Sequence, residues 1–569
     1  VKEYKRDAIL TPLFVILEVI MEVVIPVLMA NIIDIGIKNG DVHYILEMGV
    51  LLIISAILSL TFGMLSGRFA AKASAGYAKN LRKAMFHKVQ DYSFENIDKF
   101  STSSLVTRMT TDVTNVQMAY MMSIRLLARA PIMIVLSWIM TLTINVKIAL
   151  LFLIVIPLLG GTLIFIAKKA HPHFIKVFDE YDVLNNEVQE NVNAARVVKA
   201  YVREDHEIGK FHKISTTVYN LFTKAEKIVA WNSPTMQFVV YTVVLMMVLI
   251  GGESIIGGQM ETGQMTSVIV YAMQILSSLM MVSFVFVMIM IAEASSDRIA
   301  EVLDEVPEMQ NKPDAVMEAP NGDIDFENVD FSYSGEGGAL SLKKVNLHIK
   351  SGQTVGIIGG TGSAKSTLVQ LIPRLYDATR GCVKVGGVDV RDYNLEALRD
   401  QVSMVLQKNV LFTGSIYDNI RWGDENASDE EVQRVCRLAQ ADGFVQEFPH
   451  GYNTMIVQGG NNVSGGQKQR LCIARALLKK PKILILDDST SAVDTKTDAM
   501  IRKAFREEIP DTTKIIIAQR VSSVEDADMI IVMDDGKING IGTSEELLKN
   551  NAIYREVYES QVKGGNEDE

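Results

Sequence analysis

Two consecutive carboxylates, Asp487 and Asp488, follow the apolar run at residues 482–486. Further upstream, a glycine-rich loop follows a second apolar run at residues 354–358. The loop consists of Gly359, Gly360, Thr361, Gly362, Ser363, Ala364, Lys365, Ser366 and Thr367. The backbone N–H groups of such a loop bind phosphates, and an acid at the end of a neighbouring strand directs a magnesium ion. The two segments together predict a site for ATP and Mg²⁺.

The polar side chains of this loop have expected roles. Lys365 is expected to reach the β- and γ-phosphates, and Ser366 to ligate Mg²⁺. Ala364 departs from the usual pattern, which has glycine directly before the lysine. A Cβ at that position crowds the backbone or strains a positive φ, so the loop is expected to bind ATP less tightly than a loop with glycine.

Asp488 stands where an ATPase of this shape usually has a glutamate that orients the attacking water. Aspartate and glutamate have similar intrinsic pKa values, so basicity does not separate them. The aspartate side chain is one methylene shorter, however, and a misplacement of about 1 Å costs on the order of 100-fold in rate. The site is therefore expected to bind ATP and to hydrolyse it slowly.

A second phosphate-binding pattern precedes the acids. It consists of Val463 followed by Ser464, Gly465, Gly466 and Gln467. A serine, two glycines and a helix N-terminus offer a phosphate one hydroxyl, close backbone approach and a positive dipole. With the loop and the acids, this pattern resembles the ABC transporter family, whose signature reads Leu-Ser-Gly-Gly-Gln. In that family the signature faces the ATP that the opposite subunit holds, and Val463 is a mild departure.

The resemblance implies roles for four further residues. Tyr333 matches the aromatic residue that stacks on adenine, and Gln407 matches the glutamine that senses the γ-phosphate and the metal. Asp494 belongs to the loop that crosses between the two sites. Gln519 stands where the family has its switch histidine; glutamine donates a hydrogen bond to phosphate but cannot become cationic. The candidate catalytic residues are therefore Asp488, Gln519 and Gln407, and the candidate metal ligands are Ser366, Gln407 and Asp487.

Three departures, Ala364, Asp488 and Gln519, fall on the side of the site that holds the phosphates, whereas the signature is intact. By resemblance, this chain would build a weak ATP site and its signature would complete the competent site of a partner. The chain is predicted to be the degenerate-site subunit of a heterodimeric, multidrug-type bacterial ABC exporter. Two alternatives stay open: a homodimeric exporter of lipid or peptide with slow turnover, and a regulatory subunit that senses ATP without catalysis.

Apolar residues make up 48% of the 569 residues and concentrate in the first half of the chain. Six stretches are long enough to cross a bilayer, which takes about 20 residues. They lie near residues 9–33, 45–65, 121–144, 148–166, 228–251 and 265–291. Because positive residues concentrate in the long segments 68–129 and 168–227, these segments and both termini are expected in the cytoplasm. This pattern predicts a multi-pass membrane protein, and the resemblance to exporters implies the plasma (cell inner) membrane.

The predicted fold class is that of a multidomain membrane protein. Residues 1–305 are expected to form an all-α transmembrane domain with six helices, like that of a type I ABC exporter. The proline-containing residues 306–322 read as a linker, and residues 323–569 as an α/β P-loop nucleotide-binding domain. By resemblance, segments 97–109 and 197–206 are hairpin tips that form coupling helices on the nucleotide-binding domains. The last residues, 563–569, are expected to be disordered.

Two acids, Glu18 and Glu22, share one face of the first span. Acids inside a membrane usually face a cavity or a partner. They could attract a cationic substrate, or they could pair with Arg125 or Arg129. The net charge of −11 gives no sign of nucleic-acid binding. The expected partners are a second half-transporter subunit, the lipid bilayer and a small amphipathic substrate.

Overall fold

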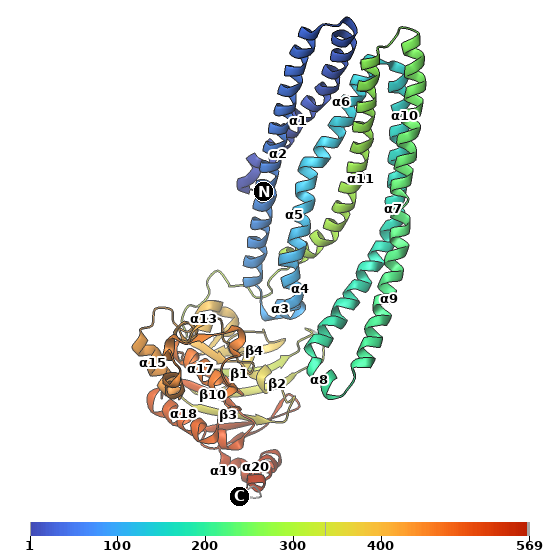
Figure 1. Cartoon of the computed structure of the whole chain (residues 1–569). Coiled ribbons are helices and arrows are strands. Elements are labelled where there is room, and N and C mark those ends of the chain that lie inside the picture. Colours follow the sequence, from blue (N-terminus) through green and yellow to red (C-terminus); the bar gives the residue numbers. More distant parts are fainter. Residues whose placement is uncertain (1, 336, 566–569) are drawn as a thin grey trace. The chain divides into compact units, whose positions relative to one another are not determined.

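The computed structural model describes residues 2–335 and 337–565. The chain forms two compact units (Figure 1). The first unit comprises Val1–Gln90 and Ser101–Glu305, and the second comprises Asp91–Phe100 and Val306–Glu569. The segment Asp91–Phe100 thus interrupts the first unit in sequence and packs with the second, whereas the sequence alone placed it in the membrane domain.

The first unit is helical. Its longer helices are α1 (Lys5–Asn31), α2 (Val42–Gln90), α5 (Val113–Met122), α6 (Ala128–Ile144), α7 (Val146–Asn193), α9 (Glu204–Val229), α10 (Asn232–Ile256) and α11 (Thr262–Asp304). Its short elements are η1 (Lys2–Tyr4), η2 (Ile32–Ile37), α4 (Thr102–Thr107), η3 (Arg108–Asp112), η4 (Ser123–Leu127) and α8 (Ala195–Ala200). Elements η2, η3 and η4 are π-helical turns.

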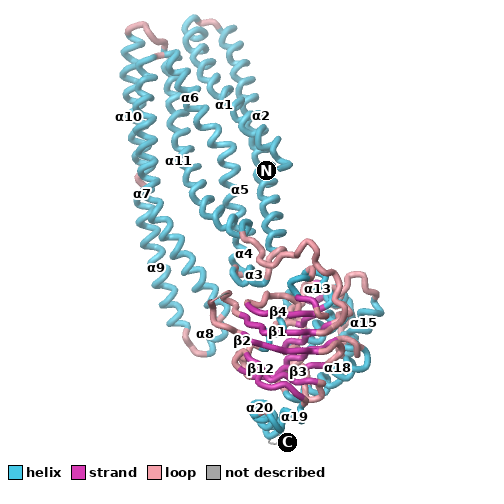
Figure 2. The backbone as a smooth tube through the Cα atoms, turned by 180° about the vertical axis from the view of Figure 1, so that it is seen from behind, coloured by secondary structure: helices cyan, strands magenta, loops and turns pink. Residues whose placement is uncertain are grey.

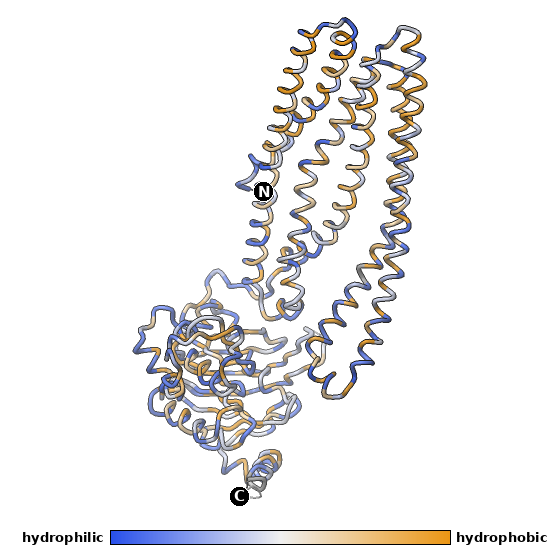
Figure 3. The backbone as a smooth tube through the Cα atoms, viewed as in Figure 1, coloured by the Kyte–Doolittle hydropathy of each residue, from blue (hydrophilic) through white to orange (hydrophobic). Residues whose placement is uncertain are grey.

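Six helical stretches of the described residues are long and apolar enough to cross a membrane. They are Lys2–Ile37, Val42–Gln90, Thr102–Ile144, Val146–Asn193, Glu204–Ile256 and Thr262–Asp304. Figure 3 shows that hydrophobic residues gather in the parts of these helices that lie away from the α8 turn. The predicted six-helix transmembrane fold is therefore confirmed.

Two apolar clusters hold the first unit together. One joins α7, α10 and α11 through residues such as Phe152, Met247 and Ile275, which are fully buried. The other joins α1, α6 and α11 around Val19 and Tyr271. The long helices thus pack through the faces that do not point to lipid.

The described residues of the second unit form two larger sheets and a two-stranded sheet of β7 and β8. The strands are β1 (Ile324–Phe331), β2 (Leu342–Ile349), β3 (Thr354–Gly359), β4 (Arg380–Val385), β5 (Val388–Asp389), β6 (Val402–Val405), β7 (Gly414–Ser415), β8 (Met455–Ile456), β9 (Ile483–Asp487), β10 (Thr513–Ile517), β11 (Met529–Asp534) and β12 (Lys537–Gly542). One sheet has the order β12-β11-β3-β10-β9-β6, and another, antiparallel, has the order β2-β1-β4-β5 (Figure 2). Strand β9 is buried at every position, as its continuous apolar run requires in a sheet covered on both faces.

Helices surround these sheets. They are α3 (Phe94–Lys99), α12 (Lys365–Gln370), η5 (Val390–Asp392), α13 (Leu395–Gln401), α14 (Ile416–Ile420), α15 (Asp429–Leu438), α16 (Asp442–Glu447), η6 (Gly451–Asn453), η7 (Gln458–Gly460), α17 (Gly465–Leu478), α18 (Thr495–Glu508), η8 (Val521–Ser523), α19 (Ser544–Asn550) and α20 (Ala552–Gly565). The alternation of parallel strands with helices is the α/β fold predicted for this region. Residues 563–565, expected to be disordered, belong to α20, and residues 566–569 lie outside the described residues.

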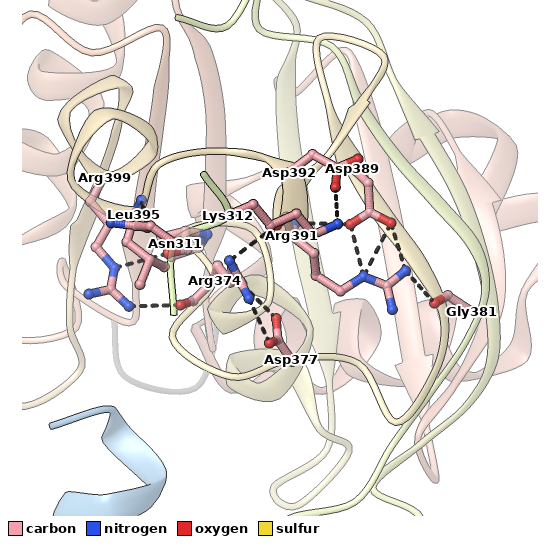
Figure 4. Close-up of polar contacts among 11 residues, drawn as sticks. Asn311, Lys312, Arg374, Asp377, Gly381, Asp389, Arg391, Asp392, Leu395 and Arg399 are labelled. Atoms are coloured by element: carbon pink, nitrogen blue, oxygen red, sulfur yellow. Dashed lines mark hydrogen bonds and ion pairs between the residues drawn. The ribbon is translucent and has the colours of Figure 1, made fainter. Parts of the chain in front are cut away.

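The predicted linker, residues 306–322, is tied to the second unit by polar contacts. Asn311 Oδ1 accepts a hydrogen bond from the backbone N–H of Leu395 at 2.9 Å, and Lys312 forms an ion pair with Asp392 at 2.5 Å. Both contacts are drawn in Figure 4, beside the ion pairs Arg374–Asp377 and Arg391–Asp389. These contacts order the linker along η5 and α13.

Candidate nucleotide site

Four adjacent strands bring the predicted site residues to one edge of the sheet. Strand β3 pairs in parallel with β10, β10 with β9, and β9 with β6. Their C-terminal ends lie level, because Ile517 lies opposite both Ile357 and Asp487. The phosphate loop follows β3, Asp487 ends β9, and Gln407 and Gln519 follow β6 and β10. The carboxyl edge of parallel strands is where α/β folds bind their ligands.

The phosphate loop places Lys365 at the start of α12. Nζ of Lys365 donates hydrogen bonds to the carbonyl oxygens of Gly359 and Gly360, each at 2.8 Å. A Cβ built on Gly360 or Gly362 would meet no described atom within 4 Å. Burial lowers the pKa of Lys365, and the two neighbouring aspartates oppose that shift. The loop therefore has room for a polyphosphate beside its lysine.

Backbone geometry explains which loop positions tolerate a side chain. A Cβ on Gly359 would lie 2.2 Å from the carbonyl oxygen of Met533, so any other residue at this position would clash with the backbone. Ala364, by contrast, carries its Cβ in the left-handed region, with φ +70° and ψ 27°. That conformation costs an L-residue about 1–2 kcal/mol. In the same loop, Thr361 is exposed and Ser363 is buried.

A hydroxyl and a carboxylate meet where the metal is expected. Oγ of Ser366 donates to Oδ1 of Asp487 at 2.9 Å, and Asp487 is buried. Burial raises the pKa of Asp487, as does the charge of Asp488, while Ser366 and Lys365 lower it. Hard oxygen ligands of this kind suit Mg²⁺, which keeps several waters and takes only one or two protein ligands. Thr367, next in the loop, is buried.

The three candidate catalytic residues are brought together. Nε2 of Gln519 donates to Oδ2 of Asp488 at 2.7 Å, and the side-chain amide of Gln407 is near enough to lower the pKa of the Asp488 carboxyl. Burial raises the pKa of Asp488, and both amides, Lys365 and Arg520 oppose that shift. Asp488 itself has a φ of +49°, a region that aspartate enters more readily than most residues. The amide of Gln519 thus holds the acid at the end of β9.

Tyr333 lies beside the phosphate-loop helix. Its hydroxyl is 3.0 Å from Oγ1 of Thr367 and donates to the side chain of Gln370 at 3.3 Å. The ring packs edge-on against Phe331 and Tyr376, with centroids 4.8 and 5.2 Å away. About half of Tyr333 is exposed. This position suits an aromatic residue that stacks on a base next to the loop.

The signature opens α17 with a complete capping box. Oγ of Ser464 accepts from the backbone N–H of Gln467 at 3.3 Å, and Oε1 of Gln467 accepts from the backbone N–H of Ser464 at 2.9 Å. Ser464 and Gly465 are exposed. A Cβ on Gly466 would lie 2.7 Å from the carbonyl oxygen of Ala492, so only glycine fits there. Among the described residues, Ser464 makes no hydrogen bond to the phosphate loop, so the two phosphate-binding elements remain separate within one chain.

The crossing loop, residues 491–494, is fastened to the signature helix. Gln469 donates to Oγ of Ser491 at 3.2 Å and accepts from the backbone N–H of Ala492 at 3.1 Å. Asp494 caps α18 by accepting from the backbone N–H of Thr497 at 2.9 Å, and this hydrogen bond lowers the pKa of Asp494. Gln469 belongs to none of the motifs in the sequence, and no local pattern marks it, because its partners Ser491 and Ala492 lie on another loop.

The acids of the first span are paired with arginine. Arg129 contacts Glu18 at 2.5 Å and Glu22 at 2.6 Å. Glu18 is also 3.4 Å from Oγ of Ser66. The sequence offered Arg125 and Arg129 as ion-pair partners for these acids, and Arg129 is the one that contacts them. Arg125 has no carboxylate partner among the described residues.

Helix α3, where the first predicted tip begins, packs within the second unit. Tyr376 donates its hydroxyl to Oδ2 of Asp98 at 2.7 Å, and its ring lies 6.0 Å from that of Phe94. The predicted tip segment 97–109 contains the end of α3, all of α4 and the start of η3, and only its residues 97–100 belong to the second unit. The second tip segment, 197–206, contains part of α8 and the start of α9.

Comparisons with known proteins agree with this arrangement. Residues 8–279 match the family described as ABC transporter transmembrane region, and residues 342–491 match the family described as ABC transporter. The uncharacterised ABC transporter ATP-binding protein YfiB of Bacillus subtilis is 37% identical over 98% of this chain and 97% of its own length. The ATP-dependent lipid A-core flippase of Desulfotalea psychrophila is 33% identical over 85% of this chain and 83% of its own.

A solved structure of a bacterial Atm1-family ABC exporter with ATP bound superposes with a TM-score of 0.87, at 22% identity, over 98% of this chain and 99% of that one. The shared fold and the six candidate spans make the chain a multi-pass membrane protein whose ATP-binding region lies in the cytoplasm. The chain belongs to the ABC transporter family and has the fold of an exporter half-transporter, with one transmembrane region and one ATP-binding region in a single polypeptide.

Proposed function

We propose that this chain is one subunit of an ATP-driven heterodimeric exporter, and that its own ATP site holds nucleotide and hydrolyses it slowly. In this proposal Lys365 binds the β- and γ-phosphates and Tyr333 stacks on adenine. Ser366, Asp487 and Gln407 would hold Mg²⁺, which would supply positive charge to offset the negative charge of the phosphates. The family membership supports ATP-driven transport, and the assignments to individual residues rest on the geometry of the strand ends.

The single observation that carries the slow-site proposal is the contact of Gln519 with Asp488 at 2.7 Å. A general base must reach the proton of its water, directly and in good geometry. Asp488 is one methylene shorter than glutamate, and its Oδ2 is engaged by the amide of Gln519. In this proposal both features keep the carboxylate from reaching an attacking water as well as glutamate would.

The signature supports the other half of the proposal. Ser464 and Gly465 are exposed at the start of a 14-residue helix, whose N-terminus favours a phosphate. Gln469 fixes this helix to the crossing loop. We propose that this face completes a competent ATP site on the partner subunit, so that hydrolysis occurs chiefly there.

The proposed cargo is an amphipathic or hydrophobic compound, moved by alternating access of the spans. The pairing of Glu18 and Glu22 with Arg129 weakens the interpretation that these acids attract cationic substrates. A lipid is the second candidate cargo, and the similarity to a lipid A-core flippase favours it. Transport of fluorescent lipid and of a hydrophobic dye into inside-out vesicles would separate the two.

Purification of the tagged chain from its native membrane tests the subunit proposal. We expect a second ABC half-transporter to co-purify. At the positions that correspond to Asp488 and Gln519 of this chain, it should carry the catalytic glutamate and the switch histidine. A stable and fully active homodimer of this chain would overturn the proposal. Passive current gated by ATP, without uphill transport, would instead favour the ATP-sensing alternative.

A further inference from the structure

Gln561, near the end of α20, bonds the backbone on both sides of Arg520. Its Oε1 accepts from the backbone N–H of Val521 at 2.8 Å, and its Nε2 donates to the carbonyl oxygen of Gln519 at 2.8 Å. A glutamine amide can satisfy one donor and one acceptor at once, and glutamate or methionine cannot do both. One side chain therefore fixes residues 518–521, which run from the end of β10 to the first residue of η8 and which we call the switch loop.

The switch loop carries two side chains that reach other parts of the site. Gln519 donates to Asp488 at 2.7 Å. Arg520 donates to the carbonyl oxygens of Val493 and Ser491, at 3.4 and 3.5 Å. The loop thus links the acid at the end of β9 with the crossing loop, and the direction of both side chains depends on the loop backbone that Gln561 holds.

Helix α20 is anchored at its beginning and exposed at its end. Tyr554 is fully buried, and its hydroxyl lies 2.9 Å from Oγ of Ser544. Ser560 and Gln561 are exposed. The contact between Gln561 and the switch loop is therefore made by the solvent-exposed end of a helix whose other end is fixed in the core.

We propose that Gln561 is a positioning residue, and that α20 uses it to hold the switch loop so that Gln519 engages Asp488. The position of the C-terminal helix would then set how firmly this chain's ATP site keeps its nucleotide. The assignment of Gln561 to the switch loop rests on the contacts alone. Its effect on nucleotide retention also rests on the proposed function.

Hydrogen exchange of the full-length chain in its assembled transporter tests the structural step. Gln561→Met keeps the length and loses both hydrogen bonds, and Gln561→Asn keeps the amide on a side chain one methylene shorter. We expect the amide of Val521 to exchange at least about tenfold faster in both variants, because local opening follows the loss of its acceptor. Glu556→Gln, an exposed change on the same helix, is the matched control and should leave exchange unaltered.

Retention of nucleotide tests the functional step. After photolabelling with azido-ATP that carries ³²P at the γ-position, we expect the intact triphosphate on this chain to fall about threefold to tenfold in Gln561→Met, as loss of one or two hydrogen bonds predicts. Glu556→Gln should retain the label. Unchanged exchange at residue 521 with unchanged retention would overturn the proposal.

Two other outcomes are also decisive. Faster exchange throughout α20, including Tyr554, with retention unchanged would assign Gln561 to helix stability and overturn its positioning role. If the wild-type chain retains no intact triphosphate, the proposed slow site fails, and the exchange at Val521 still decides whether Gln561 holds the switch loop.

Discussion

The side-chain amide of Gln519 donates a hydrogen bond to Oδ2 of Asp488 at 2.7 Å. This contact joins the two residues that replace the histidine and glutamate expected by family resemblance. It also explains why the replacements belong together: an amide donor suits a carboxylate that serves as an acceptor. The hydrogen bond fixes the carboxylate of Asp488 to the amide of Gln519. The first two predictions concern these two residues.

We predict that Asp488→Asn changes the ATPase rate of the assembled transporter by less than about twofold, because the proposed slow site would contribute little to total turnover. Replacement of the partner's catalytic glutamate should nearly abolish turnover. Steady-state ATPase assays of both variants in liposomes provide the measurement. A collapse of turnover in Asp488→Asn alone would show that this chain's site is the principal one.

We predict that the double variant Asp488→Glu with Gln519→His raises hydrolysis at this chain's site by on the order of 10- to 100-fold. The longer acid recovers the lost reach of about 1 Å, and histidine supplies a group that can become cationic. The rate is read from γ-phosphate release in a background where the partner's catalytic glutamate is removed.

Each single replacement serves as a control for the double variant. Asp488→Glu alone keeps the amide of Gln519 beside the acid, so its gain should be smaller. Equal rates in the wild-type chain and the double variant would contradict the idea that these two residues limit the site.

We predict that Ser464→Ala lowers turnover by on the order of 100-fold, although this chain's own ATP site is proposed to be the slow one. Its hydroxyl is expected to contact ATP at the partner's competent site, and loss of one transition-state contact there costs about 2–4 kcal/mol. Gly465→Asp should have a similar or larger effect, because a carboxylate would repel phosphate.

The measurement for the signature variants combines ATPase rate with nucleotide binding. Labelling of this chain through its own Lys365 site should persist in both. Ser428→Ala removes a capping serine of the same kind from α15, whose side chain accepts from the N–H of Glu431, and is the matched control. Normal turnover in Ser464→Ala would contradict the division of labour.

We predict that Arg129→Met destabilises the transmembrane unit, because it leaves Glu18 and Glu22 without their ion partner. Glu18 is buried, and Arg129 and Glu22 are partly buried, so the cost is expected to be at most the ~3–5 kcal/mol of breaking a fully buried pair. Thermal unfolding in lipid nanodiscs would report the loss. The triple variant Glu18→Gln, Glu22→Gln and Arg129→Met removes all three charges and should recover most of the stability.

Arg125→Met is the control for that series, since Arg125 has no carboxylate partner among the described residues. If the stability of Arg129→Met equals that of the wild-type chain and Glu18→Gln abolishes transport of a cationic dye, the acids serve the substrate rather than the fold.

The sequence by itself determined the local chemistry of this protein. The spacing of glycines and lysine from Gly359 to Lys365 specified the phosphate loop, because such a loop is made by consecutive residues. The signature at Ser464–Gln467 and the six apolar stretches are also local patterns, and periodicity and length are enough to read them. Family membership followed from these patterns before any contact was known.

Only the tertiary structure decided which distant residues touch. The order β3-β10-β9-β6 and its level register place Gln519 beside Asp488, although 31 positions separate them in the chain. The choice of Arg129 over Arg125 depends on how two spans pack, and both arginines lie on the same helical segment. Gln561 carried no signal in the sequence, because its partners are backbone atoms of another loop. Such contacts arise from strand register, helix packing and side-chain rotamers, which local composition does not fix.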